Sequence, residues 1–262
     1  MSTLCALALL GSCAQRPLPA ADLEGLLPTP LLLLGEQHDA ADHQRLQRQT
    51  LAQLADQGLL AAVVLEMVER GRTTAGLPRD ARETQVRDAL DWNQDLNTGA
   101  WPWTVYGPLV MQAVRSGVPV LGGNLPRGQM RTAMGESGLD ATLTAEALLQ
   151  QRENIREGHC GLLPEAQVAP MTRIQIARDR AMAQTAREAI QPGQTVLLVA
   201  GHQHVRRDIG VPAHLPDQPL AVVVAQAGRA STDAANADRV WVTSPVSPKD
   251  HCAELKAQMG AR

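Results

Sequence analysis

Five short, uninterrupted apolar runs constrain the fold of this chain more than any other feature of its sequence. They occupy residues 31–35, 61–67, 118–124, 195–202 and 220–228. Each run is continuously apolar instead of alternating with polar residues, which is typical of strands buried on both faces of a parallel sheet. The chain contains no Phe and one Tyr, so we expect Leu, Val and Ala to fill the core.

Helical segments separate these runs. The segment 39–58 carries regularly spaced leucines and ends in Gly58, a typical helix terminus, and the segment 105–117 also ends in Gly. The segment 164–190 predicts a long helix with a bend at Pro170. Alternating strands and helices predict an α/β fold with a mostly parallel central sheet flanked by helices.

Two further regions define the expected domain organisation. Residues 125–190 carry no strand pattern, so we expect a helical insertion that caps the sheet. We expect the α/β domain to span residues 21–230, with residues 231–262 as a C-terminal tail packed on it. Within the tail, residues 239–244 predict an edge strand.

The charge of the chain argues against nucleic acid as a partner. Charged residues make up 19% of the sequence and the formal net charge is −3, so no long-range positive field attracts a polyanion. With 44% hydrophobic residues, the composition is that of a globular protein with a sizeable core.

The N-terminal 13 residues resemble the signal segment of a bacterial lipoprotein. A short apolar run ends in Leu10-Gly11-Ser12-Cys13, which is similar to the site at which a signal peptidase cuts and the Cys becomes lipidated. The run is too short to span a bilayer. We therefore exclude residues 1–13 from the fold and expect lipidation of Cys13. The expected location is the bacterial cell envelope, with the lipid anchor in the outer membrane.

Two other cysteines suggest a disulfide bond. Once the leader is removed and Cys13 is lipidated, Cys160 and Cys252 remain. An even pair in an exported protein indicates a bridge, here between the middle of the chain and its tail, and two free thiols are the alternative.

Polar and ionisable side chains stand at the ends of the apolar runs. Glu36 and His38 follow the first run, Glu66 lies in the second, and His202 and His204 follow the fourth. The carboxyl ends of parallel strands meet at one edge of a sheet, where ligands bind in open α/β folds. A carboxylate within an apolar run is costly without a partner, so Glu66 needs a metal, a His or an Arg nearby.

The residue types in this cluster allow two kinds of chemistry. Glu36, His38, Glu66 and His202 could bind a divalent metal through oxygen and nitrogen. The same residues could form a general base with an orienting carboxylate. The sequence contains no H-E-x-x-H, G-x-S-x-G or Walker A motif that would decide between these interpretations.

The ordered motifs of the chain resemble those of the ChaN family. They are LLLLGEQHDAADHQ, VVLEM, VPVLGGNLPR, HCGLLPE and VLLVAGHQHVRRDIGVPAHL, spread over residues 28–228. This family consists of bacterial haem-binding lipoproteins linked to iron uptake. The resemblance implies an α/β domain, a lipid anchor in the membrane, and haem bound at or near a homodimer interface. It also implies an outer-membrane haem receptor as a partner.

The resemblance also implies a set of candidate haem-binding residues. The family uses a tyrosine as an iron ligand, and Tyr106 is the only tyrosine of this chain. If Tyr106 does not occupy that position, His159, His204 and His214 are the candidates, because imidazole is a good haem ligand. Arg206 and Arg207 could pair with the haem propionates.

A second function of a different class follows from the wider superfamily, which includes the Tiki proteases and the erythromycin esterases. There the G-E-x-H element and the strand-borne Glu act in hydrolysis, and Glu36, His38, Glu66 and His202 match them. His38 would then activate a water, and Arg178 or Arg206 would stabilise developing negative charge. We expect a binding protein more than an enzyme, with haem as the cofactor and a divalent metal as the alternative.

Overall fold

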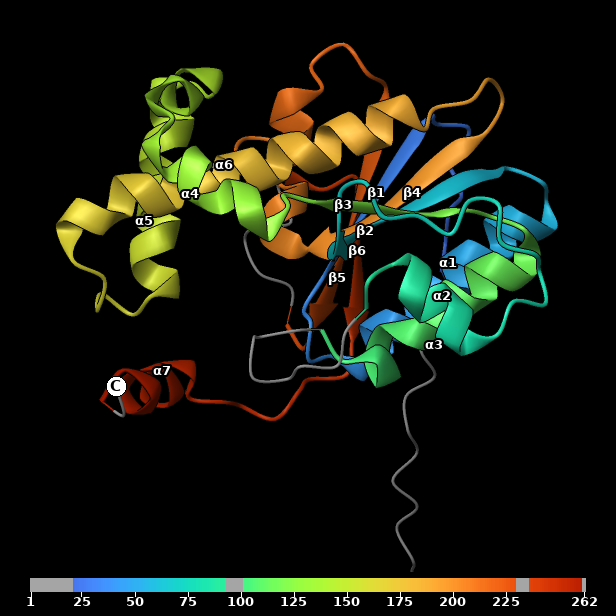
Figure 1. Cartoon of the computed structure of the whole chain (residues 1–262), viewed down its shortest axis with the longest axis horizontal. Helices are drawn as coiled ribbons and strands as arrows, with labels where there is room; N and C mark the ends of the chain where they lie inside the picture. Colours follow the sequence, from blue (N-terminus) through green and yellow to red (C-terminus); the bar gives the residue numbers. More distant parts are fainter. Residues whose placement is uncertain (1–20, 93–100, 230–235, 261–262) are drawn as a thin grey trace, which may run out of the picture.

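A computed structural model describes residues 21–92, 101–229 and 236–260, and it is built around one parallel sheet (Figure 1). The six strands run in the order β3-β2-β4-β1-β5-β6, and every neighbouring pair is parallel. Their bounds are β1 Leu31–Glu36, β2 Leu60–Glu69, β3 Val120–Asn124, β4 Thr195–Gly201, β5 Leu220–Ala227 and β6 Arg239–Thr243. The predicted α/β fold with a parallel sheet is therefore confirmed.

The first strand shows why continuous apolar runs are needed here. All six residues of β1 are buried, because it lies between β4 and β5 and is covered on both faces. Leu32 and Leu34 belong to one apolar cluster, and Leu31 and Leu33 belong to another on the opposite face. Successive side chains of a strand point to opposite faces, so an uninterrupted Leu run serves both clusters.

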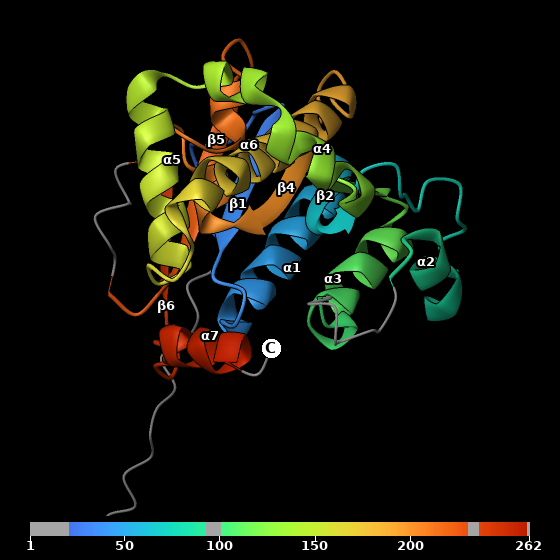
Figure 2. The same cartoon turned by 60° about the vertical axis from the view of Figure 1, so that its left-hand side comes forward.

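Helices cover the two faces of the sheet (Figure 2). One layer contains α1 (Ala41–Asp56) and α3 (Trp103–Ser116), which contact each other, and the short α2 (Glu83–Ala89) lies beside α3. The other layer is formed by α6 (Glu165–Glu188), which packs against β3 and β2. The predicted helix ends at Gly58 and Gly117 are present, and both glycines have positive φ values, 69° and 76°, that other residues rarely adopt.

The region without a strand pattern, residues 125–190, divides into two parts. Its second part, α6, is one of the layers of the domain and runs without interruption through Pro170. Its first part packs mainly on α6 and extends beyond the sheet in Figure 1. That part comprises η2 Arg127–Gln129, α4 Met130–Gly135, η3 Ser137–Thr142 and α5 Ala145–Gly158. The expectation of a single helical cap therefore applies to this first part alone.

The C-terminal tail is attached to the domain at two places. The predicted edge strand is present as β6, which pairs with β5. Beyond it, α7 (His251–Gly260) is joined to the end of α5 by the Cys160–Cys252 disulfide, so the predicted bridge is present. No helix within the described ranges combines the length and apolar character needed to cross a membrane. Cys13 lies outside the described residues.

Candidate functional site

The carboxyl ends of β1, β2 and β4 bring the predicted polar residues together. Glu36 ends β1, Glu66 lies near the end of β2, and η4 (His202–Val205) follows β4 directly. Glu36 and Glu66 are buried, whereas the side chain of His38 is 38% exposed. We call Glu36, His38, Glu66, Tyr106 and His204 the edge cluster.

Glu36 accepts hydrogen bonds on both of its carboxylate oxygens. Its Oε1 accepts from the Tyr106 hydroxyl at 2.6 Å and is 2.8 Å from His38 Nδ1. Its Oε2 accepts from Gln44 Nε2 at 2.9 Å and from the amide of Gln47. Both glutamines lie on α1, which begins five residues after Glu36. A buried carboxylate with this many donors is fully satisfied, which makes Glu36 a fixed acceptor for its neighbours.

His38 stands between the two buried carboxylates of the edge cluster. Its Nδ1 bonds to Glu36, its Nε2 is 3.9 Å from Glu66 Oε2, and its ring lies 4.5 Å from the ring of Trp101. Burial alone would lower the pKa of His38, but the bond to Glu36 and the charges of Glu66 and Glu36 outweigh it and raise the pKa. This geometry is that of an oriented, proton-carrying imidazole with one partly exposed face.

Glu66, His204 and Asp179 form a buried charged triad behind His38. His204 Nδ1 is 2.5 Å from Asp179 Oδ1, and its Nε2 is 3.3 Å from Glu66 Oε1. Burial opposes the charged imidazolium, but the charges of Glu66 and Asp179 raise the pKa of His204 to about 10. Burial would raise the pKa of Glu66, but the charge of His204 holds it well below its usual range. His204 is therefore the charged partner that the acid within the second apolar run required.

Asp179 and the backbone complete this triad. Full burial and the negative charge of Glu66 raise the pKa of Asp179, so the two carboxylates compete for one imidazolium. The N–H of Gly201 donates to Glu66 Oε2 at 2.8 Å. Arg178 Nη2 lies 3.8 Å from Glu66 Oε1, and its Nε donates to Asn124 Oδ1 at 2.8 Å.

The structure places His202 differently from His204. The predicted cluster contained His202, but His204 is the histidine whose Nε2 lies 3.3 Å from Glu66, whereas the His202 ring lies 3.0 Å from the amide of Gln203. The reason is that β4 ends at Gly201 and the chain enters a 3-10 turn, which buries His204 and leaves His202 partly exposed. Side chains two residues apart no longer share a face once the strand has ended.

The edge cluster does not have the arrangement of a metal centre. In the part of the chain that the structure describes, no group of three or more His, Cys, Asp or Glu side chains could hold a metal ion. The side chains proposed as ligands, Glu36, His38 and Glu66, are instead hydrogen-bonded to other protein groups.

Tyr106 is part of this hydrogen-bond network and is not presented to a ligand. Its side chain lies on α3, is 1% exposed, and donates its hydroxyl proton to Glu36. Burial and the nearby charge of Glu36 raise the pKa of Tyr106 well above its usual range. An iron-binding phenolate would need the opposite environment, so the described conformation does not offer Tyr106 as a haem ligand.

The three candidate histidines have different surroundings. His204 is buried between two carboxylates, so its nitrogens are not available to iron. His159 follows α5 and bonds through Nδ1 to the carbonyl oxygen of Ile155 at 2.7 Å, which leaves Nε2 as its open nitrogen. His214 ends η5 (Val211–His214), and its Nε2 is buried without a hydrogen-bond partner among the described residues. Burial, with the charge of Arg180, lowers the pKa of His214 to about 4.

The two arginines expected to bind propionates are paired with acids instead. Arg206 binds Asp208 through two nitrogens, at 3.0 and 2.7 Å. Arg207 binds Asp238 at 2.5 Å. Both pairs are partly solvent-exposed, so their contribution to stability is small.

Sequence reasoning missed several residues that shape the edge cluster. Gln44 and Gln47 lie three residues apart on α1, a spacing that places both on one face of a helix beside Glu36. A Cβ at Gly201 would come within 2.8 Å of His38 Nε2, so any larger residue there would displace the His38 ring. The burial of Asp179 could not be predicted from the sequence, because an Asp between two arginines on a helix is usually a surface residue.

Comparison with known proteins identifies a family for most of the chain. Residues 23–215 match the family described as "Haem-binding uptake, Tiki superfamily, ChaN". Among curated proteins, none matches the chain.

The solved structures that are similar to the chain include one member of this family. The structure of ChaN from Campylobacter jejuni, described as showing cofacial haem binding, is 25% identical to the chain. The match covers 81% of this chain and 86% of that one, with a TM-score of 0.64. A mutant erythromycin esterase in its open conformation is 13% identical, with a TM-score of 0.42 and coverage of 76% and 70%. A type III effector is also 13% identical, with a TM-score of 0.42 and coverage of 83% and 88%.

Proposed function

The chain belongs to the ChaN family of haem-binding uptake proteins in the Tiki superfamily, and from this premise we propose that it binds haem. The observation that carries the proposal is the family match, which extends over residues 23–215 and therefore includes the first four of the six strands, β1 to β4. The similarity to ChaN of Campylobacter jejuni along most of both chains supports it.

The residues of this chain are compatible with haem. Haem iron needs a protein ligand such as a neutral imidazole or a tyrosinate. Tyr106 and His204 are engaged in buried hydrogen bonds. His159 and His214 each have a ring nitrogen that makes no hydrogen bond to another described residue. When bound, haem would supply the iron chemistry, and the chain would supply a ligand, apolar walls and charges for the propionates.

A haemin titration tests this function directly. Protein lacking residues 1–13 is titrated with haemin and the absorbance of the Soret band is followed. We expect a saturable shift. We also expect Tyr106→Phe to bind haemin with the same spectrum, because the hydroxyl belongs to the edge cluster. The absence of a saturable shift in the unmodified protein would reject haem binding.

We also propose that the protein acts in haem uptake as a lipoprotein of the outer membrane, as a homodimer that exchanges haem with a receptor. The sequence before Cys13 supports the lipid anchor. The Cys160–Cys252 disulfide fits a compartment outside the reducing cytoplasm. Lipidation is tested by incorporation of labelled palmitate into the full chain and into Cys13→Ser, which should remain unlabelled. Dimerisation is tested by measuring the molar mass in solution with and without haemin.

A second candidate function, hydrolysis, is favoured by the position of His38. Its Nδ1 is 2.8 Å from Glu36, which orients the ring as a carboxylate orients a general base. Activity against a panel of esters would be measured for the unmodified protein, for His38→Gln and, as a control, for His43→Gln. Hydrolysis that is lost in His38→Gln and kept in His43→Gln would support this function. If the unmodified protein hydrolyses no ester faster than buffer alone, this function is rejected.

A further inference from the structure

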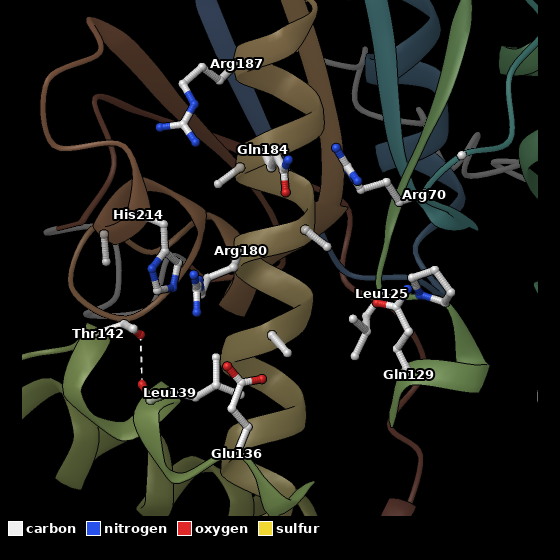
Figure 3. Close-up of a pocket in the computed structure, with 16 residues that line it drawn as sticks. Arg70, Leu125, Gln129, Glu136, Leu139, Thr142, Arg180, Gln184, Arg187 and His214 are labelled. Carbon is white, nitrogen blue, oxygen red and sulfur yellow. Dashed lines mark hydrogen bonds between the residues drawn. The ribbon is translucent and has the colours of Figure 1, made fainter. Parts of the chain in front are cut away.

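The outer surface of α6 carries a groove to which no residue of the edge cluster contributes (Figure 3). Its volume is about 640 Å³, within the range of about 300–1,000 Å³ that is typical of small-molecule sites. One wall comes from η3 and η5 and contains Thr142 and His214. The other wall comes from the segment after β3 and contains Leu125 and Gln129. We call this feature the α6 groove.

Two arginines of α6 line the groove on the same face of the helix. Arg180 and Arg187 are seven residues apart, which corresponds to two turns and about 10.5 Å of rise, and Gln184 lies between them on the same face. All three side chains are exposed. In Figure 3 both arginine side chains extend from α6 toward the wall that contains His214. Their guanidinium groups are therefore placed to bind one anion from two sides.

These two guanidinium groups provide the open positive charge of the α6 groove. Arg180 and Arg187 make no hydrogen bond or ion pair with any residue that the structure describes. Arg70, in contrast, donates two hydrogen bonds of 2.8 Å to Glu188. His214 adds no charge, because burial and the charge of Arg180 lower its pKa to about 4. A phosphate monoester, with a charge of about −1.5 to −2 at pH 7, matches two open guanidinium groups.

The other end of the α6 groove is suited to hydroxyl groups. Glu136 is the one carboxylate among the described lining residues, and it lies at the opposite end from Arg187 in Figure 3. A carboxylate repels a second anionic group but accepts hydrogen bonds from hydroxyls, and the amide of Gln129 both donates and accepts. Ala177 and Ala181 line the groove from α6 with small side chains, which leaves room for a ring.

We propose that the α6 groove binds a phosphorylated sugar, with its phosphate between Arg180 and Arg187 and its hydroxyl groups toward Glu136 and Gln129. A phosphate diester, as in a membrane headgroup, carries a single negative charge and would neutralise only one of the two guanidinium groups. A monoester is therefore the better match. This site does not depend on the proposed haem binding.

Calorimetric titration with glucose 6-phosphate tests the site in the full chain. We expect saturable binding that becomes about tenfold to a hundredfold weaker in Arg180→Gln/Arg187→Gln, as for the loss of hydrogen bonds to charged groups. Arg115→Gln/Arg131→Gln is the matched control, because it also removes two exposed arginines, and neither of these lines the α6 groove. The control should bind glucose 6-phosphate as the unmodified protein does. Both double variants should keep the melting temperature of the unmodified protein.

A second set of titrations separates the sugar from the phosphate. Inorganic phosphate should bind more weakly than glucose 6-phosphate, because it makes none of the hydroxyl contacts. Glu136→Ala should weaken binding of glucose 6-phosphate about threefold to tenfold, as for the loss of a single hydrogen bond, and should not weaken binding of inorganic phosphate.

Three results would overturn the proposal. The first is that the unmodified protein does not bind glucose 6-phosphate saturably, or binds it no better than Arg180→Gln/Arg187→Gln does. The second is that inorganic phosphate binds as tightly as glucose 6-phosphate. The third is that phosphatidylglycerol vesicles retain the protein through the two arginines while glucose 6-phosphate does not bind, which would assign the groove to a membrane headgroup. A haemin titration of the double variant should be unchanged, so failure of this site and failure of haem binding are distinguishable.

Discussion

Removing the imidazolium of His204 should be the most destabilising single change in the edge cluster. His204 is buried, and its two nitrogens lie 2.5 Å from Asp179 and 3.3 Å from Glu66. His204→Ala leaves both carboxylates buried without their common counter-ion. Breaking a buried ion pair by deleting one partner costs about 3–5 kcal/mol of the free energy of unfolding.

The raised pKa of His204 corresponds to a free energy of similar magnitude. A pKa of 6.5 in the unfolded chain and of about 10 in the folded chain corresponds to about 5 kcal/mol, at about 1.4 kcal/mol per pH unit. Because the folded pKa is the higher one, this stabilisation is fully present below pH 6.5. It decreases as the pH rises from 6.5 through about 10. The unmodified protein should therefore lose stability over this alkaline range.

Urea denaturation between pH 6 and pH 10.5 measures this effect, with the disulfide kept intact. His43→Ala is the matched control, because His43 is also buried but bonds only to neutral groups, the N–H of Gln37 and the hydroxyl of Thr243. Burial lowers the pKa of His43, so its pH-dependent stabilisation is present above pH 6.5 and is lost as the pH falls. We expect the alkaline decrease to become much smaller in His204→Ala, where only the raised pKa of His38 still contributes, and to persist in full in His43→Ala. An unchanged alkaline decrease in His204→Ala would refute the assignment of a buried imidazolium.

Three further changes test other parts of the structure. Tyr106→Phe removes a hydrogen bond to a buried carboxylate and should cost about 1.5–3 kcal/mol, measured by urea denaturation; an unchanged midpoint would contradict the bond. Gly201→Ala places a Cβ against the ring of His38 and should cost about 1–3 kcal/mol while shifting the imidazole resonances in NMR spectra, and unmoved resonances would contradict the close approach. Cys160→Ser/Cys252→Ser opens a loop with a sequence separation of 92 residues and should cost at most about 4–5 kcal/mol; a melting temperature equal to that of the oxidised protein would contradict the expected effect.

Local sequence patterns were sufficient to predict the sheet and the place of the edge cluster. A run such as that of β1 can be buried on both faces only in the middle of a layered α/β domain, so its residue types determine its environment. The position of Glu66 predicted a charged partner, because an ionised carboxylate within an apolar strand must be paired. The structure confirms both arguments, with Glu66 bonded to Gly201 and His204.

Long-range packing decided what the sequence could not predict. Asp179 reaches His204 because α6 crosses the face of the sheet beside η4. No local sequence pattern predicts where a helix crosses a sheet. The choice between His202 and His204 depended on the residue at which β4 gives way to a 3-10 turn. The boundary of a strand is less well determined by sequence than its existence, and side chains two residues apart share a face only while the strand continues.

The environment of Tyr106 shows why residue type alone cannot assign a haem ligand. The same hydroxyl can donate a proton to a carboxylate or, once deprotonated, bind iron, and the neighbouring charge decides between these roles. Here the neighbour is Glu36, a carboxylate, so the proton is retained. Iron binding by Tyr106 would therefore break this bond and deprive Glu36 of one donor. With the edge cluster intact, the remaining candidates for the iron ligand are the histidines outside it, His159 and His214.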